Sequence, residues 1–471
     1  MEATGHKTSG ITMRDKLGYA LGDMGGTLFL GMVGAFQQMF YTDVLRISPA
    51  SIAVLLMVAR IWDAVNDPMW GAMVDRRPAG KYGKFRPWLR VFAVPLAVSG
   101  ALMFVYIPGL SPGGYLAFAY VTYIAYGMIY TGINIPFGSM ASVITDDGME
   151  RSQLSVFRTI GAGIGGLPAQ ILLPFLVYSV SAAGVKYLDP NKLHISVLVL
   201  ALCSVTIYSF AFRMTKERVL SQPKEAQGHN IVKTIGALLR NRPFLVLCFA
   251  SMLLIGVTFY TQTVYNYLYK DYFVRPELYS AVTVATYAPT VLLLPVLHKL
   301  VLRFGKKRLC AWGLLLSAAA NTLALLLRTT NPFVFMGFCF LSGLGGTFLN
   351  MQLWALITDV LDNQELLSRK REEGTCYALF FFTRKLGQTM AGSGSSFLFG
   401  AIGYDETKLV QSPGVANKMY TTATLAPAIA YALMALAMAF WYNLTPEKEE
   451  ANREELRRHR AKIEAEALKE D

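Results

Sequence analysis

Twelve apolar stretches recur along almost the whole chain, and they set the fold class. About 20 apolar residues in a helix cross the roughly 30 Å hydrocarbon core of a bilayer. Only 16% of the 471 residues are charged, well below the roughly 25% of an average soluble domain. The sequence therefore predicts an all-α membrane protein with twelve transmembrane helices. The expected spans are residues 15–42, 49–75, 88–108, 114–143, 155–179, 193–213, 243–269, 279–301, 309–328, 332–359, 375–402 and 420–443.

The net charge of +13 raises the question of a nucleic-acid partner, and its distribution argues against one. Basic residues gather in alternate loops, whereas residues 109–114 carry no charge. This alternation fits the positive-inside rule. We expect a multi-pass protein of the cell inner (plasma) membrane with both termini in the cytoplasm. The basic loops follow span two (76–90), separate spans six and seven (213–242) and separate spans eight and nine (303–308).

Short internal matches divide the chain into two similar halves. Residues 142–146 (SVITD) are echoed by 355–359 (ALITD), and 157–161 (FRTIG) by 383–387 (TRKLG). Two similar six-span halves are typical of major facilitator transporters, whose site lies at the interface near the midplane. We expect two pseudo-symmetric bundles, the first with a cation site, joined by a cytoplasmic loop and followed by a charged cytoplasmic tail. The expected boundaries are 1–213, 214–242, 243–444 and 445–471.

Two acids inside the second span are the strongest functional signal. A charge at mid-bilayer costs roughly 2.5–3.5 kcal/mol on insertion scales, and the i,i+4 spacing places Asp63 and Asp67 on one helix face. Two such carboxylates repel unless something positive lies between them. Arg60 offers a structural explanation for one acid. A transported cation, with oxygens from Asn66 and Thr131, explains both, and a shared proton stays an alternative.

Three further charges lie inside predicted spans. Asp23 has glycines on both sides in residues 21–26 (LGDMGG), which permits close approach of a helix or a ligand. Arg158 and Lys385 lie inside predicted spans, one in each half of the chain, and each needs a partner inside the membrane. We expect them to pair with the acids of the first half across a central cavity. Arg384 is either a second such cation or a structural residue.

A motif after the second span has the character of a gate. Asp75, Arg77 and Arg86 lie near helix ends and suit ion pairs that break as the halves rock. Natural partners are the acids Asp146, Asp147, Asp359 and Asp362. The residues expected to couple or gate transport are Arg60, Asp75, Arg77, Arg86, Asp146, Asp359 and Asp362.

The sequence contains none of the common motifs that indicate an enzyme. It contains no phosphate-binding glycine loop, no zinc pattern and no Ser/His/Asp arrangement in a plausible context. The five cysteines fall in or beside spans without metal or redox spacing, which indicates small apolar side chains. We therefore expect no cofactor and no catalytic residue.

Residues 60–68 (RIWDAVNDP) and 83–88 (GKFRPW) resemble the glycoside–pentoside–hexuronide:cation symporter family, which is melibiose permease-like and has the major facilitator fold. Further matches are 40–44 (FYTDV), 130–131 (YT) and 135–137 (IPF), and the resemblance runs from about residue 14 to 443. It implies import of a sugar with Na⁺, Li⁺ or H⁺. It implies a cation site at Asp63, Asn66, Asp67 and Thr131, with Na⁺ as a competent ion. The implied sugar site includes Asp23, Arg158 and Lys385.

Departures from the family's pattern lie in the sugar pocket. Asn134 stands where an aspartate is expected, Gly138 replaces a tryptophan and Gly22 a basic residue, and polar positions before Lys385 become Phe380 and Phe381. The cation site is thus kept while the pocket is rebuilt. A wider, less acidic pocket suits a larger or anionic ligand such as a xyloside or hexuronide.

The sequence therefore predicts a symporter that imports a glycoside, pentoside or hexuronide with Na⁺ or H⁺ by alternating access. Alternatives are a cation-coupled lipid or lysolipid transporter on the same scaffold and a membrane sugar sensor that does not transport. Expected partners are the small-molecule sugar, a monovalent cation and membrane lipid. Each twelve-span chain encloses a complete pathway, so a monomer is expected to function.

Overall fold

Long helices make up nearly all of the structure. The computed structural model describes residues 10–145, 148–182, 184–218, 236–368, 373–445, 447–448, 450–452, 454–455 and 458. These residues form twelve helices of 17 residues or more, and each expected span overlaps one of them. Among the described residues, nine helices are long and apolar enough to cross a membrane, which confirms the all-α membrane fold; crossing by the other three stays a prediction. The helices are α1 (Met13–Met32), α2 (Pro49–Arg76), α3 (Arg86–Leu102), α4 (Pro112–Ile144), α5 (Gly148–Leu176), α6 (Pro190–Met214), α8 (Arg242–Tyr267), α9 (Tyr279–Phe304), α10 (Lys306–Leu327), α11 (Pro332–Ser368), α12 (Glu373–Ile402) and α13 (Pro413–Leu436).

Short polar residues mark where several helices begin. Ser48 accepts a hydrogen bond from the amide of Ser51, and Ser111 accepts one from Gly114. Asp189 accepts two such bonds at the start of α6. A proline follows each cap at the first helical position, where its missing N–H leaves no bond unmade. These pairs set the starts of α2, α4 and α6.

Helix ends differ from the apolar runs that predicted them. α1 is followed by two π-helical segments, η1 (Val33–Gln37) and η2 (Phe40–Val44). α11 continues to Ser368, well beyond the expected end at residue 359, and α13 begins at Pro413 rather than near residue 420. An apolar run marks the part of a helix that lies inside the hydrocarbon. The helix itself continues through polar residues for as long as its backbone hydrogen bonds continue, so its ends differ from those of the apolar run.

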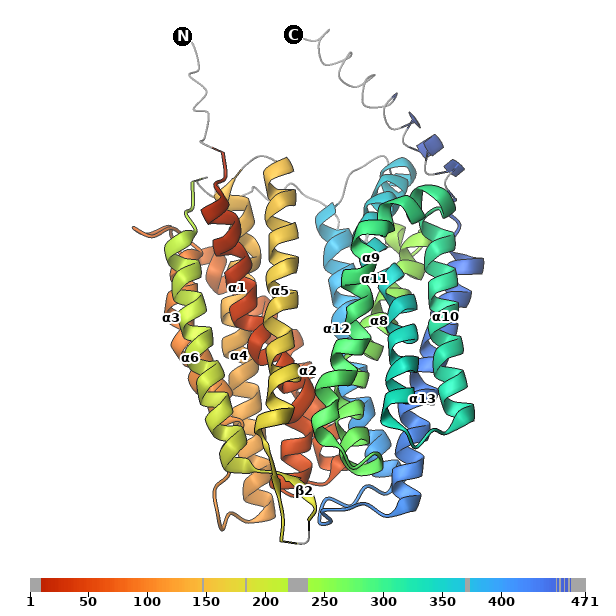
Figure 1. Ribbon diagram of the computed structural model, residues 1–471. Coiled ribbons are helices and arrows are strands. Elements are labelled where there is room, and N and C mark those ends of the chain that lie inside the picture. The colour runs from red at the N-terminus through yellow and green to blue at the C-terminus, as the bar shows by residue number, and fades with distance from the viewer. Residues whose placement is uncertain are drawn as a thin grey trace. The chain divides into compact units, whose positions relative to one another are not determined.

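The chain divides into two compact units. The first comprises Met1–Lys224 with Tyr269–Ser280 and Ser395–Val415, and the second comprises the rest. In the first unit α1 packs against α5 and α6, α3 against α4 and α6, and α2 against α4 (Figure 1). In the second unit α11 packs against α10 and α8. Two short segments from the second half of the sequence thus belong to the first unit.

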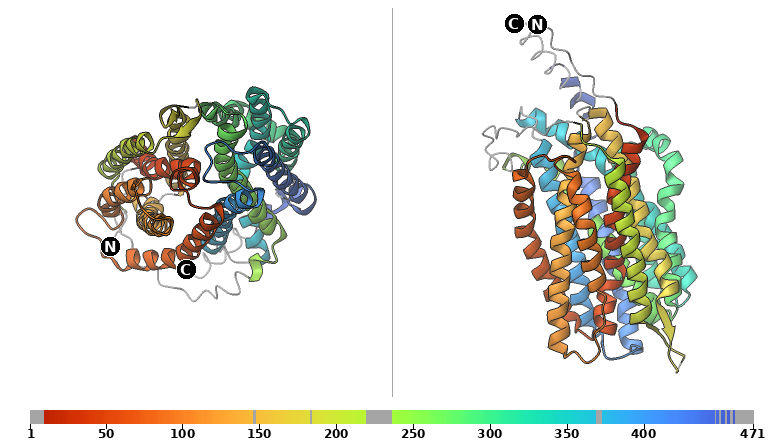
Figure 2. Two further views of the ribbon diagram at one scale, coloured as in Figure 1. Left: turned by 90° about the horizontal axis from the view of Figure 1, so that it is seen from below. Right: turned by 90° about the vertical axis from the view of Figure 1, so that its left-hand side faces the viewer.

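A β-hairpin closes one end of the first unit. Strands β1 (Tyr178–Val180) and β2 (Lys186–Leu188) pair antiparallel between α5 and α6, with Tyr178 opposite Leu188. The hairpin lies at the end of the unit opposite the start of α1, as Figures 1 and 2 show. We call this the hairpin end.

Each half contains an equivalent close contact between two helix backbones. A Cβ on Gly161 of α5 would lie 2.0 Å from the carbonyl oxygen of Ala20 in α1, and a Cβ on Gly387 of α12 would lie 2.1 Å from that of Met252 in α8. The internal match in the sequence pairs these same glycines. Each half therefore uses glycine at the same place to bring two helix backbones together.

Candidate functional site

The two acids of α2 face α4. Thr131 donates a hydrogen bond from Oγ1 to Asp67 Oδ1 at 3.1 Å. One turn earlier on α4, a Cβ added to Gly127 would lie 3.4 Å from Asp63 Oδ1. Asp63 and Asp67 are thus aligned with Gly127 and Thr131 over one turn of each helix. The structure brings three of the four predicted cation residues together.

Asn66 lies apart from this alignment. Its side chain is 1% exposed, and its Nδ2 has no hydrogen-bond acceptor among the described residues. A buried amide without a partner is costly, typically about 1–3 kcal/mol. Its carbonyl-type oxygen remains a suitable ligand for a hard cation. The role of Asn66 in the cation site stays a prediction.

Arg60 neutralises one of the two acids. Its Nη1 lies 3.0 Å from Asp63 Oδ2, one turn along α2. The Asp63 side chain is 23% exposed and the Arg60 side chain 35%. The ion pair with Arg60 is therefore a structural explanation for Asp63, and it does not involve Asp67.

A second pair lies between α1 and α5. Arg158 Nε is 3.5 Å from Asp23 Oδ2, and the Arg158 guanidinium lies 5.2 Å from the centroid of the Phe137 ring on α4. A Cβ on Gly138 would be 4.0 Å from Arg158 Nη1, and no other described residue beyond its own helix turn comes within that distance. The expected pairing of Arg158 with Asp23 is present, and open space lies beside the guanidinium.

One stripe of α4 joins both pairs. Gly127, Thr131, Asn134 and Gly138 are spaced by four, three and four residues, which places them on one helix face. Asp63 lies opposite the first of them, Asp67 opposite the second, and Arg158 beside the last. Asn134, half-buried between them, makes no side-chain hydrogen bond to a described residue. The stripe thus runs from the two acids of α2 to the Arg158 guanidinium.

Lys385 belongs to the second unit and is exposed on α12. The guanidinium of its neighbour Arg384 lies 5.8 Å from the centroid of the Phe380 ring, so the two cations differ in their surroundings. That Lys385 faces Asp23 and Arg158 stays a prediction.

Arg86, one of the predicted gate residues, has contacts that the sequence did not predict. Arg86 donates through Nη2 to the carbonyl oxygen of Phe212 at 2.6 Å. Glu217 accepts the backbone N–H groups of Lys84, Phe85 and Arg86 at 2.7–2.9 Å and so caps the start of α3. Nothing in the sequence near Glu217 signals this, because the contact spans more than 130 residues.

The remaining gate residues lie in separate surroundings. Arg77 lies 5.1 Å from the centroid of the Trp88 ring, and Lys306 of α10 forms an ion pair with Asp359 of α11. Asp362 is half-buried on α11. Asp146, Asp147 and the side chain of Asp75 lie outside the described residues. The pairing of the gate across the halves stays a prediction.

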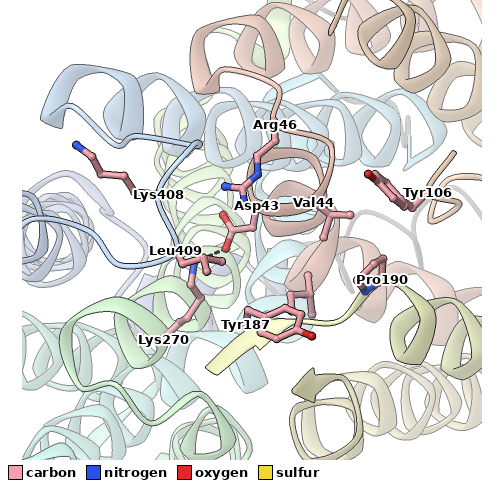
Figure 3. A pocket seen from close by; sticks show the side chains of 10 residues that line it. Asp43, Val44, Arg46, Tyr106, Tyr187, Pro190, Lys270, Lys408 and Leu409 are labelled. Atoms are coloured by element: carbon pink, nitrogen blue, oxygen red, sulfur yellow. Dashed lines mark hydrogen bonds and ion pairs between the residues drawn. The ribbon is translucent and has the colours of Figure 1, made fainter. Parts of the chain in front are cut away.

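A buried ion cluster lies at the hairpin end of the first unit. Lys270 forms ion pairs with Asp43 and with Asp271, and Tyr404 donates to Asp43 Oδ1 at 2.8 Å. The side chains of Lys270 and Asp271 are 4% and 1% exposed. Figure 3 shows Asp43 and Lys270 pointing toward each other. Both line a cavity of about 300 Å³, as does Tyr187. We call Asp43, Lys270, Asp271 and Tyr404 the Lys270 cluster. In the sequence, only the charges at the ends of two expected spans pointed to it.

Comparisons with known proteins give concordant matches. Residues 18–446 match the family described as MFS/sugar transport protein. The chain is 30% identical to the glucuronide carrier protein homolog of Escherichia coli over 93% of its own length and 94% of the relative, and 29% identical to the isoprimeverose transporter of Lactiplantibacillus pentosus over 92% and 89%. The crystal structure of a D-xylose–proton symporter superposes with a TM-score of 0.63 at 13% identity, covering 91% of this chain and 97% of that one, and confirms the major facilitator fold.

Proposed function

The chain belongs to the family of MFS/sugar transport proteins, and we propose that it imports an anionic sugar or glycoside together with a monovalent cation. Family membership makes it a membrane-spanning sugar transporter and not an enzyme, and it confirms the resemblance to sugar–cation symporters. The coupling ion, the class of sugar and the direction of transport are the proposal.

The stripe on α4 is the observation that carries this proposal. Asp67 accepts a hydrogen bond from Thr131, and Asn134 stands one turn further toward Gly138 and Arg158. A cation that binds Asp67 takes the Thr131 oxygen as a further ligand, which turns the hydroxyl proton away from the carboxylate. Sugar hydroxyls bound at Asn134 would lie next to that ion. Binding of either ligand therefore favours binding of the other.

An anionic substrate suits the other end of the stripe. The Arg158 guanidinium touches Asp23 through Nε, while Nη1 faces the open space beside Gly138. A guanidinium edge binds carboxylates through paired N–H groups. Asn134 adds no negative charge to repel such a group. The name of the glucuronide carrier homolog is consistent with a uronic acid as substrate.

The cation supplies the driving force. One positive charge that moves down 100 mV releases about 2.3 kcal/mol, which corresponds to roughly fifty-fold accumulation of a neutral solute. A monoanionic sugar that moves with one cation carries no net charge, so its accumulation then rests on the cation concentration gradient. Two cations per anionic sugar would restore the voltage term. Membrane potential therefore distinguishes the two stoichiometries.

The charge pattern supports an orientation in the membrane. The basic ends of α3 and α10, marked by Arg86 and Lys306, favour the cytoplasmic side under the positive-inside rule. The hairpin end would then face outward, with both termini in the cytoplasm of a cell whose inner membrane holds the protein. We expect a monomer to transport.

The test is thermal stability of the purified protein with neutral sugars and their uronic acids, in Na⁺ and in choline at pH 6 and pH 8. A ligand that binds the folded protein raises its stability by mass action. We expect stabilisation by uronic acids, larger in Na⁺ than in choline. Equal stabilisation by neutral and acidic sugars would overturn the substrate class, and stabilisation that follows pH instead of Na⁺ would reassign the ion to H⁺.

Two readouts separate the alternatives. Uptake into proteoliposomes distinguishes a transporter from a sensor, since a sensor binds without accumulation. A matched assay with labelled lysolipid covers the lipid alternative. Lysolipid uptake without sugar response would contradict the proposal.

A further inference from the structure

A basic cavity lies at one end of the second unit. Its volume is about 270 Å³. It lies between the start of α8, the end of α11 and the segment that follows α13. Its walls are formed by Arg240, Asn241, Arg242, Pro243, Asn363, Leu367, Asn443, Leu444, Lys448 and Asn452. The proposed function gives this cavity no role.

The walls of the cavity carry three positive charges. Arg240, Arg242 and Lys448 are exposed, and none of them forms an ion pair with a described residue. Aspartate and glutamate are missing from the described residues that line it. Glu447 precedes Lys448, but it hydrogen-bonds to Thr445 and lies close to Arg308, which lowers the pKa of its carboxyl. Among the described residues of its walls, the cavity therefore combines three cations with no anion.

A network of amides forms the floor of the cavity and fixes its shape. Asn241 is 1% exposed and donates from Nδ2 to Gln364 Oε1 at 2.8 Å, while its Oδ1 caps the amide of Phe244. Asn363 donates to Asn241 Oδ1 at 3.4 Å and accepts from Asn452 at 3.2 Å. These bonds join α8, α11 and the C-terminal segment. The network thus fixes Asn241, which lies between Arg240 and Arg242 in the chain.

The position of the cavity relates it to the membrane edge. α8 begins at Arg242, and the exposed apolar side chains of Leu239 and Leu367 lie beside Arg240 in the chain and on the cavity wall. The same end of the unit carries Lys306 at the start of α10. A basic hollow next to apolar side chains at the cytoplasmic end of helices suits an anionic headgroup whose acyl chains stay in the bilayer.

We propose that this cavity binds a phosphate group through Arg240, Arg242 and Lys448. Arginine forks match phosphate oxygens bidentately, and lysine adds a point charge. Two sources share this chemistry, the headgroup of an anionic phospholipid and a soluble phosphate. The proposed phosphate site shares no residue with the proposed sugar and cation sites.

Lipid binding to the purified protein tests the proposal. Native mass spectrometry would compare phosphatidylglycerol with phosphatidylcholine on wild type and on Arg240→Gln/Arg242→Gln. We expect the double substitution to weaken phosphatidylglycerol binding about thirty-fold (about 2 kcal/mol). The matched control is Arg328→Gln/Lys418→Gln, which removes the same charge from exposed positions of the second unit outside the cavity. It should bind the lipid as wild type does.

Further arms cover the source and the folding of the variants. Inorganic phosphate, titrated while thermal stability is followed, should protect wild type if the source is soluble and leave it unchanged if the source is lipid. Protection by phosphate that the double substitution abolishes supports a soluble source. Phosphatidylglycerol binding that the double substitution weakens, without protection by phosphate, supports a lipid source. Lys448→Gln, on the opposite wall, tests the same cavity if the double variant fails to fold. Equal loss in pocket and control variants, or no selectivity for phosphatidylglycerol together with no response to phosphate, would overturn the proposal.

Discussion

Replacing Lys270 by methionine tests what holds the hairpin end together. Methionine keeps an unbranched side chain but removes the charge between Asp43 and Asp271. Those carboxylates are only 12% and 1% exposed. Removing one partner of a buried ion pair costs about 3–5 kcal/mol, because it leaves an uncompensated buried charge. We therefore expect Lys270→Met to be among the most destabilising single substitutions in the first unit.

The same cost predicts a change in the conformational equilibrium. The Lys270 cluster joins segments from both halves of the sequence within one unit, and in the proposed alternating-access cycle these segments would part. If water solvates the carboxylates once they part, 3 kcal/mol shifts the ratio of open to closed molecules more than 100-fold. Tyr187, on the cavity wall beside the cluster, offers a reporter position.

The assay measures labelling of Tyr187→Cys by a membrane-impermeant maleimide, in a background where the five native cysteines are alanine. Lys270→Met should speed labelling and lower the melting temperature. Replacing the whole ion cluster with neutral groups should restore both, so Lys270→Met/Asp43→Asn/Asp271→Asn is the control. Wild-type labelling and stability in the single variant, or no recovery in the triple variant, would refute the reasoning.

Three further substitutions test the remaining sites. Asp67→Asn should abolish cation-driven accumulation while sugar binding persists, as measured by uptake and by calorimetry; uptake against a gradient in this variant would remove Asp67 from the cation site. Gly138→Leu should fill the space beside Arg158 and weaken substrate binding at least tenfold, whereas Na⁺-dependent stabilisation without sugar stays unchanged. Glu217→Ala removes the acceptor of three backbone N–H groups and should cost about 2–3 kcal/mol of unfolding free energy, with Glu217→Gln falling between Ala and wild type in thermal denaturation.

The sequence predicted what depends on local pattern. Apolar length located each long helix among the described residues. The i,i+4 spacing of Asp63 and Asp67 predicted that both lie on one face of α2, and that face contacts Gly127 and Thr131. The match of Gly161 with Gly387 anticipated equivalent helix contacts in the two halves. Each of these features follows from helical periodicity or from internal repetition, which one chain displays by itself.

What the sequence did not predict depends on contacts between distant residues. Glu217 reaches back to the amides before α3, and Lys270 meets Asp43 across 227 positions. The stripe from Gly127 to Gly138 became visible only when Arg158 and the two acids of α2 were placed against it. The predicted helix ends were wrong for a different reason. Polar residues, such as those after Asp359, continue α11 beyond the apolar run.

The close approach of α1 to α5 at Gly161 has a consequence for engineering the protein. A methyl group there would lie within 2.0 Å of a backbone oxygen that has nowhere to go, whereas Gly163, two residues along the same helix, has open space around it. In a saturation library, position 161 should accept glycine alone, and position 163 should accept alanine and larger residues. The same contrast should separate Gly387 from Gly394 on α12. Library designs that aim to change substrate range should therefore leave the two contact glycines fixed and vary their open neighbours.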